Sequence, residues 1–98
     1  MLTPAEQERA RQFADPIPFI AGRWAAKEAI LKMLGTGWRG QIAWTDMEIL
    51  PDAHGRPVVT LSGECARIAA ELGIIRVLIS ITHTHQTAAA SALGTVPG

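Results

Sequence analysis

The chain has 98 residues, 48% of them hydrophobic and 18% charged, and its nine basic and nine acidic residues leave no net charge. This length fits one domain, residues 1–98, with one modest core. The balanced charge excludes an overall field that would draw the protein to nucleic acid or to an anionic membrane. The high apolar content of so short a chain predicts apolar surface that a partner subunit covers.

The single cysteine, Cys65, excludes an internal disulfide and offers no metal-ligand spacing. We expect a buried thiol and a cytoplasmic location, where thiols stay reduced. The first residues are polar, and no run of the sequence is long and apolar enough to span a bilayer. The sequence therefore predicts a soluble, unexported protein without a membrane segment.

The first predicted element is a short helix that runs to about Phe13. Thr3 suits the N-cap, Pro4 suits the first helical position, and Glu6 closes a capping box. Asp15-Pro16-Ile17-Pro18 then breaks the helix, because the residue before a proline is driven out of helical geometry. We expect a second helix to begin close to the second proline of this segment.

The second predicted helix has a broad apolar face and ends at the glycines Gly35 and Gly37. Its apolar residues are Phe19, Ile20, Trp24, Ile30, Leu31, Met33 and Leu34. After Gly40 the pattern of residues 42–49 predicts a strand with an irregularity near Thr45-Asp46.

The rest of the chain predicts a turn, two further strands and one more helix. Residues 51–57 form a turn before a short strand over 58–61, and Ser62 is suited to cap a helix over about 63–72. A strand over 77–82, a polar turn and a last strand over 87–93 complete the pattern. The fold class predicted is α+β, with helices packed on an antiparallel sheet.

The second helix carries a group of charges, Arg23, Lys27, Glu28 and Lys32. The spacing of four between Glu28 and Lys32 is typical of an exposed ion pair, which contributes a few tenths of a kcal/mol, roughly 0.3. The same charges also suit a phosphorylated ligand and its metal. Spacing alone favours the exposed ion pair.

The Gly35-Thr36-Gly37 loop has two interpretations. Its glycines tolerate positive φ and expose N–H groups that suit a phosphate. A glycine after a helix is more often a C-cap, and the negative end of the helix dipole disfavours an anion there. The order of helix and loop also excludes a Walker-type phosphate site, in which the loop comes first.

Two histidines, His83 and His85, flank Thr84 after the third predicted strand. The spacing favours an exposed polar turn over part of a zinc site, because no third histidine or nearby cysteine accompanies them. A general base or phosphate donor at His83 is the functional alternative. Arg56, in the predicted turn over 51–57, is first a turn residue and second a candidate anion contact.

Three motifs together resemble the holo-acyl-carrier-protein synthase family of 4′-phosphopantetheinyl transferases. They are Arg-Trp-Ala-Ala-Lys-Glu-Ala-Ile-Leu-Lys-Met-Leu-Gly-Thr-Gly over 23–37, Gly55-Arg56-Pro57, and Ile79-Ser80-Ile81-Thr82-His83-Thr84. The resemblance extends from about Thr3 to about Leu93. It implies transfer of 4′-phosphopantetheine from coenzyme A to a serine of an apo-acyl carrier protein, release of adenosine 3′,5′-bisphosphate, dependence on Mg²⁺, and a homotrimer with active sites between subunits.

The resemblance also assigns site residues. Glu28 matches the metal-ligand glutamate and helps to take the serine proton, and Lys32 matches the lysine that neutralises phosphate charge in the transition state. His83 is expected near the phosphates. The positions that match coenzyme A contacts are Arg23, Lys32, Gly35, Pro57, His83 and Thr84.

Two further expectations concern the first helix and the start of the chain. Arg9 and Arg11 are candidate contacts for an acidic carrier protein, and simple solvation is the alternative. Family members begin with a strand of the type Gly-Ile-Gly-Xaa-Asp, whose aspartate is a second Mg²⁺ ligand, and the match to this chain starts after it; Asp15 does not replace that residue. We therefore expect either an active transferase with one metal carboxylate, or a noncatalytic homologue that binds coenzyme A or carrier protein.

Overall fold

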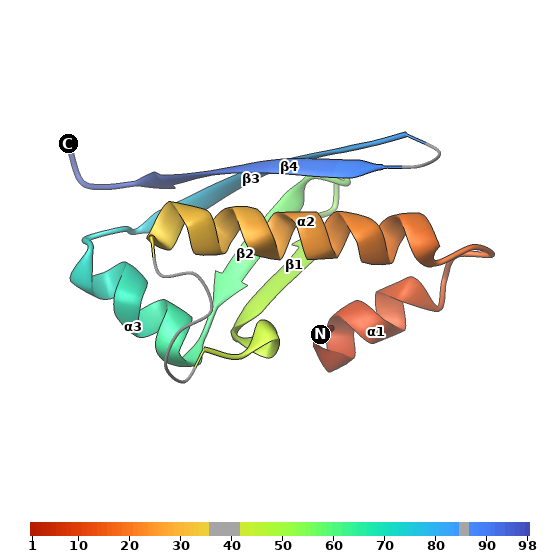
Figure 1. Ribbon diagram of the computed structural model, residues 1–98, viewed down its shortest axis with the longest axis horizontal. Helices are drawn as coiled ribbons and strands as arrows, with labels where there is room; N and C mark the ends of the chain where they lie inside the picture. Colours follow the sequence, from red (N-terminus) through yellow and green to blue (C-terminus); the bar gives the residue numbers. More distant parts are fainter. Residues whose placement is uncertain (36–41, 85–86) are drawn as a thin grey trace.

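The structure, a computed structural model, describes residues 1–35, 42–84 and 87–98. It confirms the α+β class, because helices combine with antiparallel strand pairs (Figure 1). The elements in chain order are α1 (Pro4–Ala10), α2 (Ile17–Leu34), the 3₁₀ turn η1 (Trp44–Asp46), β1 (Met47–Pro51), β2 (Pro57–Leu61), α3 (Gly63–Glu71), β3 (Arg76–His83) and β4 (Ala88–Thr95). Predicted features at Thr36, Gly37, Gly40 and His85 lie outside the described residues.

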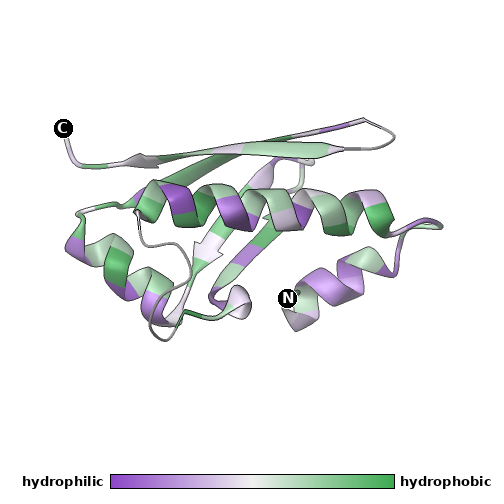
Figure 2. Cartoon of the chain, in the orientation of Figure 1, coloured by the Kyte–Doolittle hydropathy of each residue, from purple (hydrophilic) through white to green (hydrophobic). Residues whose placement is uncertain are grey.

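Helix α2 is the central element, with the β3–β4 hairpin along one side and α1 and the β1–β2 hairpin on the other (Figure 1). Because two sides are covered, polar and apolar residues alternate around α2 instead of dividing into two faces (Figure 2). The prediction of one broad apolar face is wrong for Trp24. This residue is 51% exposed, and its ring lies against that of Trp44 with centroids 4.6 Å apart and a tilt of 30°.

The strands form two antiparallel pairs. In the first pair Met47 lies opposite Leu61, and in the second Arg76 lies opposite Thr95. The predicted irregularity before the first strand is η1. His83, predicted in the turn, is instead the last residue of β3 and lies opposite Ala88.

The core lies where α2, β1 and α3 meet. Cys65 is fully buried there, as predicted. The buried residues of this core are Ala26, Ile30, Leu31, Leu34, Met47, Ile49, Cys65 and Ala69. No helix among the described residues has the length and apolar character needed to cross a membrane.

Helix α1 is shorter than predicted, since it ends at Ala10 and not at Phe13. The predicted capping box is confirmed: the N–H of Glu6 donates to Oγ1 of Thr3 at 3.2 Å, and the N–H of Thr3 donates to Oε1 of Glu6 at 2.9 Å. The same carboxylate also accepts the N–H of Ile49 at 2.8 Å. One acidic side chain therefore caps α1 and attaches it to β1.

Candidate functional site

Glu28 and Lys32 lie on the same side of α2, in an open groove of about 720 Å³ between α2 and β4. Residues four apart lie on the same face of a helix, so the spacing in the sequence predicts that these two side chains are neighbours. Glu28 is half-buried and Lys32 is exposed. The opposite wall of the groove consists of the small residues Ala88, Ala89, Ala90, Ser91 and Ala92, which leave room for a ligand.

Arg23, Pro57 and His83 line a separate cavity of about 310 Å³. The Arg23 side chain is 7% exposed, and its Nε donates to the backbone oxygen of Ile49 at 2.8 Å. Its guanidinium carbon lies 4.1 Å from the centroid of the Phe19 ring, a cation–π contact that fixes the charge in place. Burial lowers the pKa of Arg23, and the group stays protonated at neutral pH.

The imidazole of His83 packs against a helix position that has no side chain. A Cβ at Gly22 would lie 2.6 Å from Nε2 of His83. His83 also lines a small cavity of about 140 Å³ with Thr84 and Asp15. Oγ1 of Thr84 accepts the N–H of Thr87 at 3.0 Å, which orders the chain beside the histidine.

Gly35 ends α2 in the left-handed region, with φ at 74°. Its N–H donates to the carbonyls of Leu31 at 3.0 Å and Lys32 at 3.1 Å. The C-cap interpretation is therefore confirmed for Gly35, and its N–H is already used within the protein. A ligand contact at this position would depend on the space that glycine leaves.

Lys27 does not belong to either cavity. Its side chain is fully buried, and Nζ donates to Oε1 of Glu6 at 2.7 Å and to the backbone oxygens of Met1 and Trp44. All three ammonium donors are thus used inside the protein. The position that the sequence groups with Arg23 and Lys32 has a structural role.

The two groups of site residues face different directions in one chain. Arg23 and Glu28 are five residues apart on α2, which places their side chains roughly 140° apart around the helix axis. The groove of Glu28 and the cavity of Arg23 have no lining residue in common. In one chain, the described site residues Glu28 and Arg23 therefore lie in two separate cavities.

Among residues 1–35, 42–84 and 87–98, no three His, Cys, Asp or Glu side chains gather where they could hold a metal ion. Glu28 is a single carboxylate in an open, polar groove. That donor set fits Mg²⁺, which binds through one or two carboxylates together with substrate phosphates and keeps several waters. It does not fit a structural zinc site, which needs four protein ligands.

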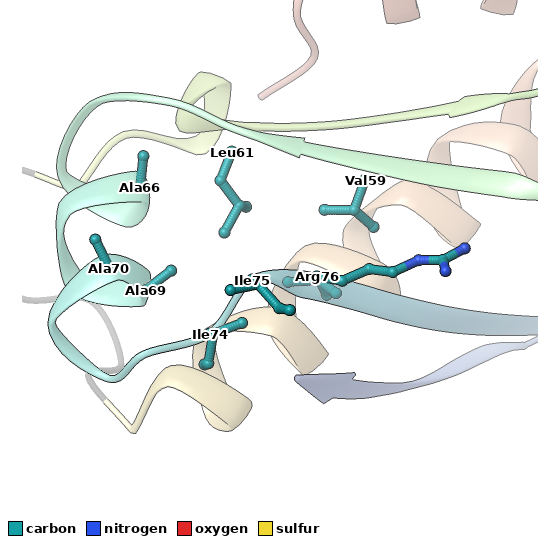
Figure 3. A pocket seen from close by; sticks show the side chains of 9 residues that line it. Val59, Leu61, Ala66, Ala69, Ala70, Ile74, Ile75 and Arg76 are labelled. Carbon is teal, nitrogen blue, oxygen red and sulfur yellow. The ribbon is translucent and has the colours of Figure 1, made fainter. Parts of the chain in front are cut away.

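Another cavity, of about 280 Å³, lies between α3 and the strands β2 and β3 (Figure 3). None of the predicted site residues lines it. Its labelled side chains in Figure 3 are Val59, Leu61, Ala66, Ala69, Ala70, Ile74, Ile75 and Arg76. Val77 also lines it, so eight apolar side chains and one arginine surround the cavity, and the described residues offer no acid–base chemistry there.

Comparisons with known proteins identify the family of this chain. The family described as the 4′-phosphopantetheinyl transferase superfamily matches residues 1–90, so the chain belongs to this superfamily. The holo-[acyl-carrier-protein] synthase of Natranaerobius thermophilus is 43% identical over 93 residues, which are 95% of this chain and 74% of that protein. Within the superfamily the chain is thus a member of the holo-acyl-carrier-protein synthases, a family of transferase enzymes.

Solved structures of the same family have the same fold. The holo-[acyl-carrier-protein] synthase of Neisseria meningitidis superimposes with a TM-score of 0.86 at 34% identity, over 96% of this chain and 75% of that one. The enzyme from Bacillus anthracis, in complex with coenzyme A (3′,5′-ADP), gives a TM-score of 0.81 at 31% identity, over 98% and 76%. The sequence resemblance to this family is confirmed.

Proposed function

We propose that this chain transfers 4′-phosphopantetheine from coenzyme A to a serine of an apo-acyl carrier protein, in the cytoplasm. The observation that carries the proposal is the groove that holds Glu28 and Lys32 together beside a wall of small residues. Membership of the synthase family and the coenzyme A complex of the Bacillus anthracis relative support it.

The groove supplies the groups that the reaction needs. The serine oxygen attacks the phosphorus that carries pantetheine, a new P–O bond forms, and the bond to the second phosphate breaks and releases adenosine 3′,5′-bisphosphate. Glu28 takes the serine proton, directly or through water. Lys32 is an exposed cation on the same helix face and stabilises the negative charge that develops on the phosphates.

Glu28 is also the residue that would hold Mg²⁺. The ion supplies charge neutralisation of the diphosphate when bound. The remaining oxygen ligands would come from coenzyme A and water, because Glu28 is the one acidic side chain that the described residues bring to the groove.

We further propose that a second copy of the chain completes the site, in a homotrimer. Arg23, Pro57, His83 and Thr84 of one copy would bind coenzyme A against Glu28 and Lys32 of the next. The separation around α2 of the groove of Glu28 from the cavity of Arg23 supports this arrangement. The exposed pair Leu78 and Leu93, opposite each other on the β3–β4 hairpin, supports contact between copies.

The test is a mass measurement of apo-carrier protein after incubation with coenzyme A, Mg²⁺ and this chain. We expect a gain equal to one phosphopantetheine arm, and a sharp loss of that gain in Glu28→Gln and Lys32→Ala. The alternative is a noncatalytic protein that binds coenzyme A or carrier protein. Calorimetric binding of coenzyme A by a chain that gives no mass gain at high concentration would favour the alternative.

A further inference from the structure

Next to the cavity of Arg23 and His83 lies a second cavity, of about 320 Å³, where α1, the start of α2 and the β1–β2 turn meet. The two cavities have Arg23, Pro51, Gly55 and His83 in common. Arg9 lines only the second one. The resemblance makes Arg9 a candidate contact for the carrier protein, with solvation as the alternative, and the structure places it in the lining of the same cavity as Arg23.

Arg9 belongs to an ordered stack of cations and rings. Its guanidinium carbon lies 5.4 Å from the centroid of Phe13, and Phe13 lies 5.5 Å from Phe19. Phe19 in turn lies 4.1 Å from the guanidinium of Arg23. Arg9 is four residues from Phe13, and Arg23 is four residues from Phe19. This spacing favours contact between an arginine and an aromatic ring, so the two cation–π pairs could have been predicted from the sequence.

The guanidinium of Arg9 is only partly satisfied by the protein. Nη1 donates to Oε1 of Gln12 at 2.7 Å. Nε is buried and has no hydrogen-bond partner among the described residues. A buried donor without a partner costs free energy, which an acceptor from a ligand would recover.

The charges around this cavity favour an anion. Arg9, Arg23 and His83 face it together with one carboxylate, Asp15, whose Oδ1 accepts the N–H of Ile17 at 3.1 Å. Burial lowers the pKa of Arg23, the Glu6 carboxylate raises it, and the positive charge of Arg9 lowers it again. The two arginines therefore repel each other, and a bound anion would relieve the repulsion.

We propose that Arg9 binds the 3′-phosphate of coenzyme A and thereby selects coenzyme A over the same molecule without that phosphate. The inference rests on the proposed transferase function, which assigns the diphosphate to the groove of Glu28 and Lys32. The 3′-phosphate is then the anion still without a partner. A guanidinium fork matches phosphate geometry, and the rings of Phe13 and Phe19 offer an apolar wall to the nucleoside.

Calorimetry with two ligands, coenzyme A and 3′-dephospho-coenzyme A, tests the inference without carrier protein. In Arg9→Gln we expect binding of coenzyme A to weaken on the order of tenfold to a hundredfold, because one charge-assisted hydrogen bond is lost. Binding of the dephosphorylated ligand should change by less than about twofold. Arg9→Lys, which keeps the charge but loses the fork, should fall between.

Arg11→Gln is the matched control, since it removes the same charge from the same end of the helix. Arg11 is exposed and pairs with Glu8 at 2.8 Å, outside the cavity. Binding of both ligands should match the wild-type chain. Equal weakening of both ligands in Arg9→Gln, or no weakening of either, overturns the inference about Arg9. A wild-type chain that binds no coenzyme A overturns the proposed function as well, so the two failures are distinguishable.

Discussion

Nζ of Lys27 lies 2.7 Å from Oε1 of Glu6, and both side chains are completely buried. The two residues are 21 positions apart, on α2 and α1. Glu6 further accepts the N–H groups of Thr3 and Ile49, and Lys27 donates to the backbone oxygen of Trp44. This pair connects the first helix, the central helix and the first strand through one charged network.

Removal of one partner should destabilise the protein strongly. In Lys27→Met the Glu6 carboxylate stays buried without its cation, which costs about 3–5 kcal/mol of unfolding free energy. Urea unfolding at neutral pH measures this loss. Glu6→Gln should also be costly, since the buried ammonium of Lys27 then has no opposite charge beside it.

The double variant Glu6→Gln, Lys27→Met should cost less than the sum of the two single changes, because neither charge is then left unpaired. The exposed pair Glu8 and Arg11 is the comparison, and Glu8→Gln should change the unfolding free energy by less than about 1 kcal/mol. Additive losses in the buried pair would contradict a direct interaction between Glu6 and Lys27.

The sequence predicts local features of this fold better than contacts between distant segments. The capping box at Thr3 and Glu6 is confirmed because both residues lie within one helical turn. The partner of Lys27 was not predictable from spacing, since it depends on how α1 folds back on α2. The sequence grouped Lys27 with Lys32 by proximity along the chain, although residues five apart face different sides of a helix.

The candidate site shows the same division. Glu28 and Lys32 meet because four residues separate them on one helix. Their separation from Arg23 follows from the same helix geometry, and it could be predicted from the five-residue spacing between Arg23 and Glu28. That Arg23 joins Pro57 and His83 depends on the approach of β2 and β3 to α2, which the family resemblance supplied and local patterns do not.

Cys65 should produce a pH dependence of stability at alkaline pH. Burial, and then the negative charges of Asp46 and Glu64, raise the pKa of its thiol from 9.0 to about 11. Between these values the unfolded chain loses the thiol proton and the folded chain keeps it, so stability falls as the pH rises. The contribution is fully present below pH 9 and is lost by about pH 11, up to about 2–3 kcal/mol.

Cys65→Ala isolates this contribution from the other groups that titrate above pH 9. The variant should lose some stability at neutral pH, because the small cavity left in the core costs about 1 kcal/mol. Its unfolding free energy should then decline less steeply between pH 9 and pH 11 than that of the wild-type chain. Parallel pH profiles for the two proteins would contradict the raised pKa of Cys65.

Gly22→Ala should weaken coenzyme A binding with little loss of stability. The new Cβ would approach Nε2 of His83 to 2.6 Å and push the exposed imidazole aside. Alanine favours the helix over glycine by about 1 kcal/mol, which offsets the contact of 3.2 Å with Ile81. Calorimetry should show roughly tenfold weaker binding, and thermal unfolding should change little.

His83→Ala separates this effect from a general distortion of α2. If the methyl group added by Gly22→Ala acts only by displacing the imidazole, the double variant Gly22→Ala, His83→Ala binds coenzyme A no more weakly than His83→Ala alone. A further loss in the double variant would mean that the added methyl group disturbs the cavity by another route.

Two inactive variants should restore activity to each other if the site lies between copies. Lys32→Ala damages the groove of α2, and His83→Ala damages the cavity on the other side of the same helix. In a mixed assembly, some sites combine an intact groove from one copy with an intact cavity from the next. With equal amounts and free exchange of subunits, about a quarter of the sites are complete, by random pairing across a symmetric interface. The mass gain of carrier protein should recover to about that fraction.

Glu28→Gln mixed with Lys32→Ala is the control, because both changes damage the same groove and no pairing repairs it. Equal inactivity of both mixtures would assign the whole site to a single chain, and α2 would then have to bind coenzyme A on both of its sides at once.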